Sequence, residues 1–279
     1  MEKRQRNYVI VLGCGESILN LTEEEKKFIN SCKYVIGVNK FMAFYKQSGL
    51  VPNYIYFHDE LENAVLMFKY ILNVCRKDGL TNLTFFTNWH FKCLTSTLWF
   101  LFLFYLKIRA FVKWYILRKR LWLTDKVYLK MEFKRLIPPK NSNIIGLKLE
   151  KIDDGKNWAK SLYEPLFNYK GSLSSILNLC SIIAPNIDIY LVGNDFNGSK
   201  YFFQNELEKL PFDSIDFTSS IVKQKNRHMS FITTNGKKFT DKLPYILYKL
   251  KECGIELFCI NPDSLLVKEG GLKFKKLPL

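Results

Sequence analysis

Short apolar runs alternate with amphipathic segments along the first third of the chain. The apolar runs at 8–12, 34–38, 54–57 and 82–87 are rich in β-branched and aromatic residues, which favours strands. The segments at 22–32, 41–49 and 64–76 have helical periodicity. Thr22 and Glu25 form a capping box at the start of the first of these, and Gly49 is a typical helix stop. Strands that alternate with helices predict a parallel sheet.

The alternation returns after residue 140. Residues 172–184 and 241–253 are expected helices, and residues 188–192 and 255–260 are expected strands. The predicted fold class is therefore α/β, with a doubly wound, mostly parallel, Rossmann-like sheet. One domain is expected from residues 1–94 and 140–279 together, with residues 95–139 inserted as a helical subdomain.

The insertion has its own pattern. Residues 98–106 (LWFLFLFYL) are almost wholly apolar, but this run is shorter than the roughly 20 residues needed to span a bilayer. Basic and aromatic side chains then interleave: Lys107, Arg109, Phe111, Lys113, Trp114, Tyr115, Arg118, Lys119, Arg120 and Trp122. Aromatic rings beside cations favour a segment that lies on an anionic membrane surface. A lid that packs on the rest of the protein is the alternative.

Charge and cysteine content narrow the class of protein. The formal net charge of +16 indicates an anionic partner, which could be nucleic acid, an acidic membrane or a phosphorylated ligand. A generally lysine-rich composition is the plainer explanation. The seven cysteines form no CxxC pair, which is typical of reduced thiols in a cytosolic protein. The charged start of the chain predicts no signal peptide.

Two loops at expected strand ends are candidate ligand sites. Gly13-Cys14-Gly15-Glu16-Ser17 could bring backbone N–H groups close to a phosphate, although plain turn geometry also explains the glycines. The spacing matches neither the dinucleotide GxGxxG pattern nor a P-loop. The second loop, residues 193–198, contains Asn194 and Asp195, which either bind a ribose or base or form an Asx turn.

Histidine is the natural general base near neutral pH, and the chain has three: His58, His90 and His228. His58 follows an expected strand, and His228 lies in a basic polar stretch. The sequence lacks metal-ligand spacing such as HxxxH and lacks a GxSxG elbow, so a metal-independent mechanism is expected. Phosphate charge would then be met by hydroxyls, backbone N–H groups and cations such as Lys170.

Five segments, in order, resemble the bacterial lipooligosaccharide sialyltransferases of glycosyltransferase family 42. They are VIVLGCGES, VIGVNKF, YFHDEL, KGSLSSILNLCSIIAPNIDIYLVGNDFNGSKYFF and IELFCINPDSLL. The resemblance covers most of the chain outside residues 95–160. It implies a variant GT-A-like fold and inverting transfer of sialic acid from CMP-sialic acid, without a metal ion or other cofactor.

The resemblance also implies roles for individual residues. The CMP site would be lined by Gly13, Gly15, Ser17, Asn39, Ser172 and Asp195. The position of the two candidate loops adds Cys14 and Asn194 to this site. Lys170 stands where the family has an arginine, and Tyr201 matches a tyrosine that binds the departing phosphate. His228 would be the general base, with His58 as its rival.

A second resemblance is to the motility-accessory-factor proteins. It rests on GVNKFMAFYKQSGLVPNYIYFHDE, with Asn39, Pro52, Asn53 and Asp59 at the matching positions. Both resemblances imply nine-carbon acidic sugars carried on CMP, and a surface glycolipid or polysaccharide as acceptor. The expected location is cytoplasmic, at the inner face of the cytoplasmic membrane, and a homo-oligomer is left open.

Two other classes of function remain open at this point. One is a nucleotide or pterin pyrophosphokinase-like enzyme on the same sheet, which would need Mg²⁺. The other is a basic nucleic-acid-binding protein, but the sequence has no RNP-like aromatic motif, so no nucleic-acid partner is expected.

Overall fold

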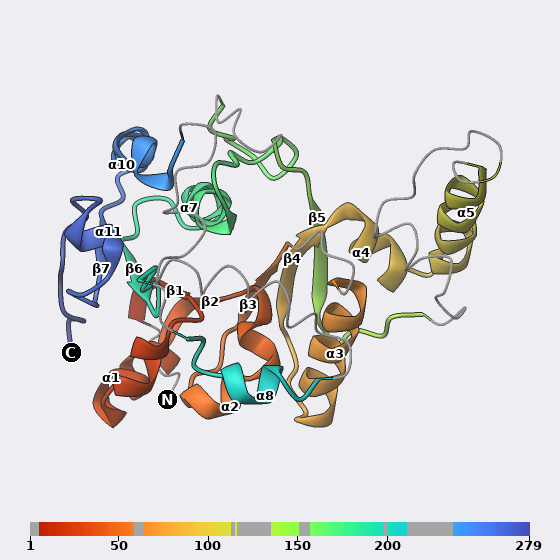
Figure 1. Ribbon diagram of the computed structural model, residues 1–279, viewed down its shortest axis with the longest axis horizontal. Helices are drawn as coiled ribbons and strands as arrows, with labels where there is room; N and C mark the ends of the chain where they lie inside the picture. Colours follow the sequence, from red (N-terminus) through yellow and green to blue (C-terminus); the bar gives the residue numbers. More distant parts are fainter. Residues whose placement is uncertain are drawn as a thin grey trace.

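The computed structural model describes residues 6–58, 64–112, 115, 135–150, 157–197, 200–210 and 237–279. Seven strands in these ranges form one sheet in the order β5-β4-β3-β2-β1-β6-β7, and every strand pairing between them is parallel (Figure 1). The strands are β1 (Arg6–Leu12), β2 (Cys32–Val38), β3 (Tyr54–Phe57), β4 (Thr84–Asn88), β5 (Asn143–Leu147), β6 (Ile189–Val192) and β7 (Leu257–Cys259). The predicted α/β class with a parallel, Rossmann-like sheet is confirmed at this level.

The strand order places a change of direction between β1 and β6. The chain starts in the middle of the sheet, adds β2 to β5 outward on one side, and then returns to place β6 and β7 on the other side of β1. In open parallel sheets, ligands bind beyond the carboxyl ends of the strands at such a switch point. The topology therefore directs the search for a site to the loops that follow β1 and β6.

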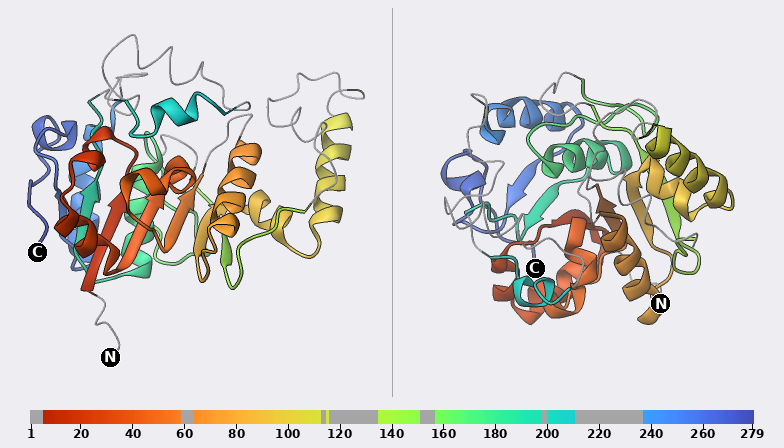
Figure 2. Two further views of the ribbon diagram at one scale, coloured as in Figure 1. Left: turned by 90° about the horizontal axis from the view of Figure 1, so that it is seen from below. Right: turned by 45° about the vertical axis from the view of Figure 1, so that its right-hand side comes forward.

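Helices cover both faces of the sheet (Figures 1 and 2). One face carries α1 (Glu23–Asn30), α2 (Tyr45–Ser48), α3 (Ala64–Lys77) and α8 (Gln204–Leu207), and the other carries α7 (Ser172–Ile183) and α10 (Leu243–Glu252). Helices α4 (Trp89–Thr95) and α5 (Trp99–Phe111) extend beyond β5, and α11 (Leu265–Lys268) follows β7. Short 3₁₀ turns occur at Glu16–Asn20, Asn39–Ala43 and Phe239–Asp241.

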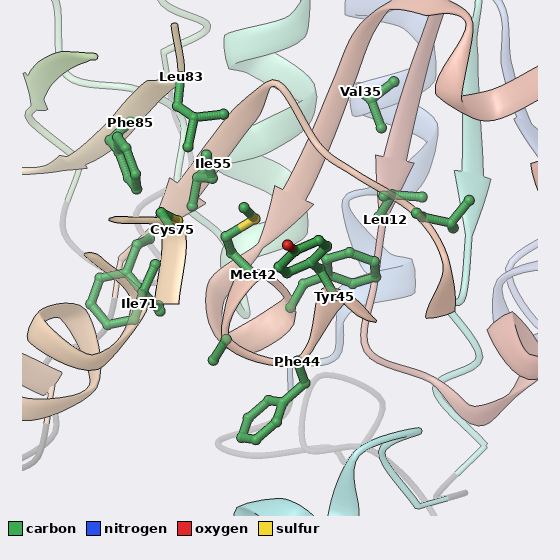
Figure 3. Close-up of a cluster of buried hydrophobic side chains, with 14 of the residues drawn as sticks. Leu12, Val35, Met42, Phe44, Tyr45, Ile55, Ile71, Cys75, Leu83 and Phe85 are labelled. Carbon is green, nitrogen blue, oxygen red and sulfur yellow. The ribbon is translucent and has the colours of Figure 1, made fainter. Parts of the chain in front are cut away.

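Side-chain alternation along the strands divides the core into two layers. Ile10 and Leu12 of β1 face α1, α2 and α3, whereas Val9 and Val11 face α7 and α10. Figure 3 shows the first layer, where residues from β1, β2 and β3 meet side chains of the 3₁₀ turn, α2 and α3. All four of these β1 side chains are fully buried, which explains the continuous apolar run in the sequence.

All but one of the predicted elements are confirmed in kind, with shifted ends. The capping box at Thr22 is present, and α1 ends at Asn30 because Cys32 already starts β2. The single helix expected at 41–49 is wrong: a 3₁₀ turn, Asn39–Ala43, precedes the one-turn helix α2, and Gly49 ends α2 with a left-handed φ of 70°. Aromatic side chains at 41, 44 and 45 pack inward from this turn, so tertiary packing overrides the helical periodicity.

Besides the one-turn helices α8 and α11, two described elements were not predicted. Strand β5 was missed because it is a half-exposed edge strand with a glycine in its interior. Helix α4 was missed because no side chain caps its N-terminus, and it follows β4 without a loop. Both elements lie at the end of the sheet from which α5 projects (Figure 1).

Helix α5 falls within the expected insertion, whose remaining part is mostly outside the described ranges, so the subdomain itself stays a prediction. Among the described helices, none is long and apolar enough to cross a membrane.

Candidate functional site

The loops after β1 and β6 are joined by backbone hydrogen bonds at the switch point. The N–H of Gly13 donates to the carbonyl oxygen of Val192 at 2.8 Å, and that of Gly15 donates to the carbonyl oxygen of Gly193 at 2.7 Å. The two loops predicted to bind a ligand therefore meet in space, at the carboxyl edge of the sheet.

Asp195 is the centre of this junction and is 3% exposed. Its carboxylate accepts hydrogen bonds from the Ser17 N–H at 3.0 Å, the Ser17 hydroxyl at 2.5 Å and the Asn261 amide Nδ2 at 2.8 Å. A Cβ atom on Gly15 would collide with this carboxylate. We call Gly13, Gly15, Ser17, Asp195 and Asn261 the switch-point cluster.

The glycines of this cluster thus have a packing role. A Cβ atom on Gly13 would meet the carbonyl oxygen of Gly193 and the side chain of Asn194. The Asn194 amide donates to the carbonyl oxygens of Val11 and Val192, each at 3.1 Å, so this side chain joins the two strands. The sequence left open whether these glycines approach a phosphate or form a turn; in the structure they allow the loop after β6 to approach.

Asn39 connects the end of β2 to α7. It has a left-handed φ of 50°, a conformation that asparagine tolerates better than most residues. Its Nδ2 donates to the Ser172 hydroxyl at 3.2 Å, and its Oδ1 accepts from the backbone N–H of His58 at 3.3 Å. One side chain therefore gathers the ends of β2 and β3 and the first residue of α7.

The N-terminus of α7 faces the same edge, and two lysines belong to the loops at this edge. Gly171, at φ 123°, caps the helix without a side-chain hydrogen bond, and Lys170 precedes it at φ 51°. A second cation, Lys40, lies close enough to Cys14 to counter part of the burial effect that raises the pKa of that thiol to about 12. The helix dipole and two lysines make this part of the edge attractive to an anion.

Buried polar atoms without a partner occur at the ends of β3 and β4. Within the described part of the chain, the Tyr56 hydroxyl, Asn88 Oδ1 and Thr87 Oγ1 are buried and accept or donate no hydrogen bond. Tyr56 and Asn88 lie on the face covered by α7, and Thr87 lies on the opposite face. Burial raises the pKa of Tyr56, and the nearby Ser175 hydroxyl opposes that rise without reaching hydrogen-bond geometry.

The His58 ring stacks on Tyr56, with ring centroids 6.4 Å apart. We call Asn39, Tyr56, His58, Asn88 and Ser172 the α7-side cluster. Buried polar groups are normally satisfied, so the unpartnered atoms of this cluster are candidate contacts for a ligand or for water.

Two histidines at this edge are held neutral. Burial, with His90 as the second cause, lowers the pKa of His58 to about 4. Burial, with Arg109 as the second cause, lowers the pKa of His90 to about 4. A general base works best with a pKa near the working pH, so this shift weakens His58 as the base at neutral pH.

Tyr201 lies beside the glycine loop. Tyr201 and Gly15 form an isolated antiparallel bridge, and the N–H of Phe202 donates to the Cys14 carbonyl oxygen at 3.1 Å. The Tyr201 ring stacks on Phe203 at a centroid distance of 5.3 Å. The segment after residue 200 therefore covers the switch point.

The structure brings most predicted site residues to one edge, in the two clusters and the loops beside them. His228 and Asp59 lie outside the described residues. The residues that sequence reasoning missed are Asn261, Tyr56 and Asn88. Each is polar and lies within or just after an apolar strand, which was an available signal for this edge.

In the described ranges, no group of three His, Cys, Asp or Glu side chains is placed to hold a metal ion. Compared with known proteins, the chain matches no protein-family model, no curated protein and no solved structure. Function is therefore argued from the geometry of the site.

Proposed function

We propose that this chain is an enzyme, a metal-independent inverting glycosyltransferase that moves sialic acid, or a related nine-carbon acidic sugar, from a CMP donor to a glycolipid or polysaccharide. The observation that carries the proposal is the meeting of the glycine loop, Asn39 and the N-terminus of α7 at one edge of a parallel sheet. These elements offer hydroxyl, amide and backbone groups for a nucleotide, with two lysines for its phosphate.

The switch-point cluster has a supporting role in this proposal. Asp195 already accepts three hydrogen bonds from the protein, so it holds the glycine loop in place. Nucleotide contacts then fall to the groups that border the loop, namely Cys14, Asn39 and Ser172, with Tyr201 beside the phosphate.

The anion site at α7 serves the leaving group. In the transfer, an acceptor hydroxyl oxygen bonds to the anomeric carbon while the bond from that carbon to the CMP phosphate oxygen breaks. The phosphate leaves with the electron pair, and the hydroxyl proton passes to a base. Lys170 and the α7 N-terminus stabilise the charge that develops on the phosphate.

His228 is the base in this proposal, because the lowered pKa of His58 makes that imidazole a poor proton acceptor near pH 7. His58 instead orients the Asn39 side chain through its backbone N–H. Retained turnover in His228→Ala would remove that histidine from the mechanism.

A nucleotide screen tests the donor class. CMP should raise the melting temperature of the protein more than UMP, GDP or ATP does, because a ligand that binds only the folded state stabilises it. Turnover of CMP-sialic acid should persist in EDTA, whereas a pyrophosphokinase-like enzyme would need Mg²⁺. Equal or greater stabilisation by ATP or GDP would overturn the CMP proposal.

Lys170→Ala sharpens the same test. Loss of a charge-assisted contact with phosphate should weaken CMP binding about tenfold or more. The matched control is Lys251→Ala, since Lys251 is an exposed lysine in the last turn of α10, away from this edge. If both variants bind CMP as the wild type does, the phosphate does not lie at α7.

A further inference from the structure

Helix α5 presents an apolar outer face to solvent. Six large side chains on it are each between 45% and 59% exposed: Phe100, Leu101, Phe104, Tyr105, Ile108 and Phe111. Single exposed apolar residues are ordinary on protein surfaces, but a contiguous group of this size marks a contact surface. We call these six residues the outer face of α5.

The opposite side of the same helix is anchored. Leu103 and Ala110 are fully buried, Leu106 is 4% exposed, and α5 packs on α4. Two aromatic pairs add order to the exposed side: Phe100 stacks on Phe104, and Phe111 stacks on Tyr115. The outer face is therefore an ordered surface on a helix that is fixed by its buried side. Figure 1 shows this helix projecting past the edge of the sheet.

The positions of the cations indicate what this face contacts. At 100° per residue, the six side chains fall within an arc of about 140°, and Lys107 and Arg109 lie just beyond its two borders. Basic side chains at the borders of an apolar arc are typical of helices that lie in a membrane interface. There the apolar face enters the acyl boundary and the cations meet lipid headgroups.

The sequence around α5 has the positive charge that binding to an anionic membrane surface requires. Residues 79–124 contain seven Lys or Arg residues and no Asp or Glu. A protein partner for an apolar face does not require this one-sided charge, but an anionic leaflet attracts each cation near it. The chain as a whole carries a formal net charge of +16, which acts in the same direction.

From this apolar arc and its basic borders, we propose that the outer face of α5 binds the surface of an anionic lipid bilayer and lies in its plane. The binding needs no nucleotide or sugar, so it stands independently of the proposed transferase activity. Because α5 packs on α4, which follows β4 directly, the membrane would lie near the β3–β4 end of the carboxyl edge. A lipid-linked acceptor would then be presented beside the α7-side cluster.

Vesicle sedimentation tests the proposal. The full chain should sediment with vesicles of phosphatidylcholine mixed with phosphatidylglycerol and much less with phosphatidylcholine alone, and added salt should weaken the binding. Phe104→Glu places a negative charge, like that of the lipid, inside the arc and should lower the partition coefficient about tenfold or more. Its matched control is Phe274→Glu, because Phe274 is 43% exposed and follows β7 at the other end of the sheet.

Three outcomes would overturn the proposal. The first is equal sedimentation with both kinds of vesicle, and the second is an equal loss of binding in Phe104→Glu and Phe274→Glu. The third is a dimer by light scattering that Phe104→Glu dissociates while vesicle binding is unchanged, which would make a second copy the occupant. Circular dichroism and thermal melting of each variant confirm that the fold is intact, and CMP binding, measured separately, reports on the transferase proposal alone.

Discussion

At the β1–β6 end of the carboxyl edge, Asp195 has hydrogen-bond donors on both carboxylate oxygens, and a Cβ on Gly15 would have no room. At the β3–β4 end, Tyr56 and Asn88 bury polar atoms that meet no partner among the described residues. The same edge of one sheet thus holds a fully paired carboxylate at one end and unpaired buried polar atoms at the other.

This difference indicates that the β1–β6 end stabilises the fold and that the β3–β4 end has groups available to bind a ligand. A satisfied, tightly packed junction stabilises the fold and leaves few groups for a ligand. Unpartnered buried groups cost folding free energy and are expected where a ligand or water completes them. The site that the sequence suggested at the glycine loop is therefore shifted, in our proposal, toward Asn39 and the N-terminus of α7.

The largest loss of stability is expected from a substitution at the β1–β6 end. Gly15→Ala should lower the free energy of unfolding by about 3 kcal/mol, because the added methyl group forces the buried Asp195 carboxylate away from its donors. Urea unfolding measures this. The exposed neighbour is the control, since Glu16→Ala should change stability by less than about 0.5 kcal/mol. Equal stability of the two variants would show that the loops move apart freely.

The next largest effect is the pH dependence of stability that arises from two histidines at the β3–β4 end. The folded-state pKa of His58 and of His90, about 4 each, lies below the ordinary value near 6.5. Between about pH 4 and pH 6.5 the unfolded chain therefore binds more protons than the folded chain does. Their stabilising contribution is complete above about pH 6.5 and is lost as the pH falls toward 4.

Between about pH 7 and pH 5 each histidine should account for a loss of about 1–2 kcal/mol of stability, measured by urea unfolding at several pH values. Few carboxylates titrate in that window, so the double variant His58→Gln/His90→Gln should flatten the profile there. An unchanged slope in the double variant would mean that the two imidazoles are not held neutral by burial.

The smallest effect compares one hydroxyl from each end. Ser17→Ala removes a donor to the buried Asp195 carboxylate and should cost about 1–2 kcal/mol of stability. Tyr56→Phe removes a hydroxyl that has no partner and should stay within about 0.5 kcal/mol of the wild type, or be slightly more stable. Chemical denaturation of both variants in parallel measures the two changes in the free energy of unfolding. A larger loss of stability in Tyr56→Phe than in Ser17→Ala would contradict the comparison between the two ends.

The sequence predicted the fold class because its strands are buried on both faces. A strand such as β1, with Val9 to Leu12 all fully buried, leaves a continuous apolar run that no exposed element shares. It also predicted which loops meet, since the carboxyl ends of parallel strands share one edge. It failed at β5, where half-exposure weakens the pattern, and at residues 41–49, where inward-facing aromatic side chains favour a 3₁₀ turn and a one-turn helix over one continuous helix.

Only the tertiary structure decided what the glycines of the first loop are for. A glycine after a strand looks the same in the sequence whether it binds a phosphate, forms a turn or leaves room for another loop. The choice depends on Asp195, which is 178 residues beyond its partner Ser17 and reaches it only because β6 returns to pair with β1. The protonation of His58 was equally hidden, because a pKa depends on burial and neighbouring charge, and both are properties of the folded chain.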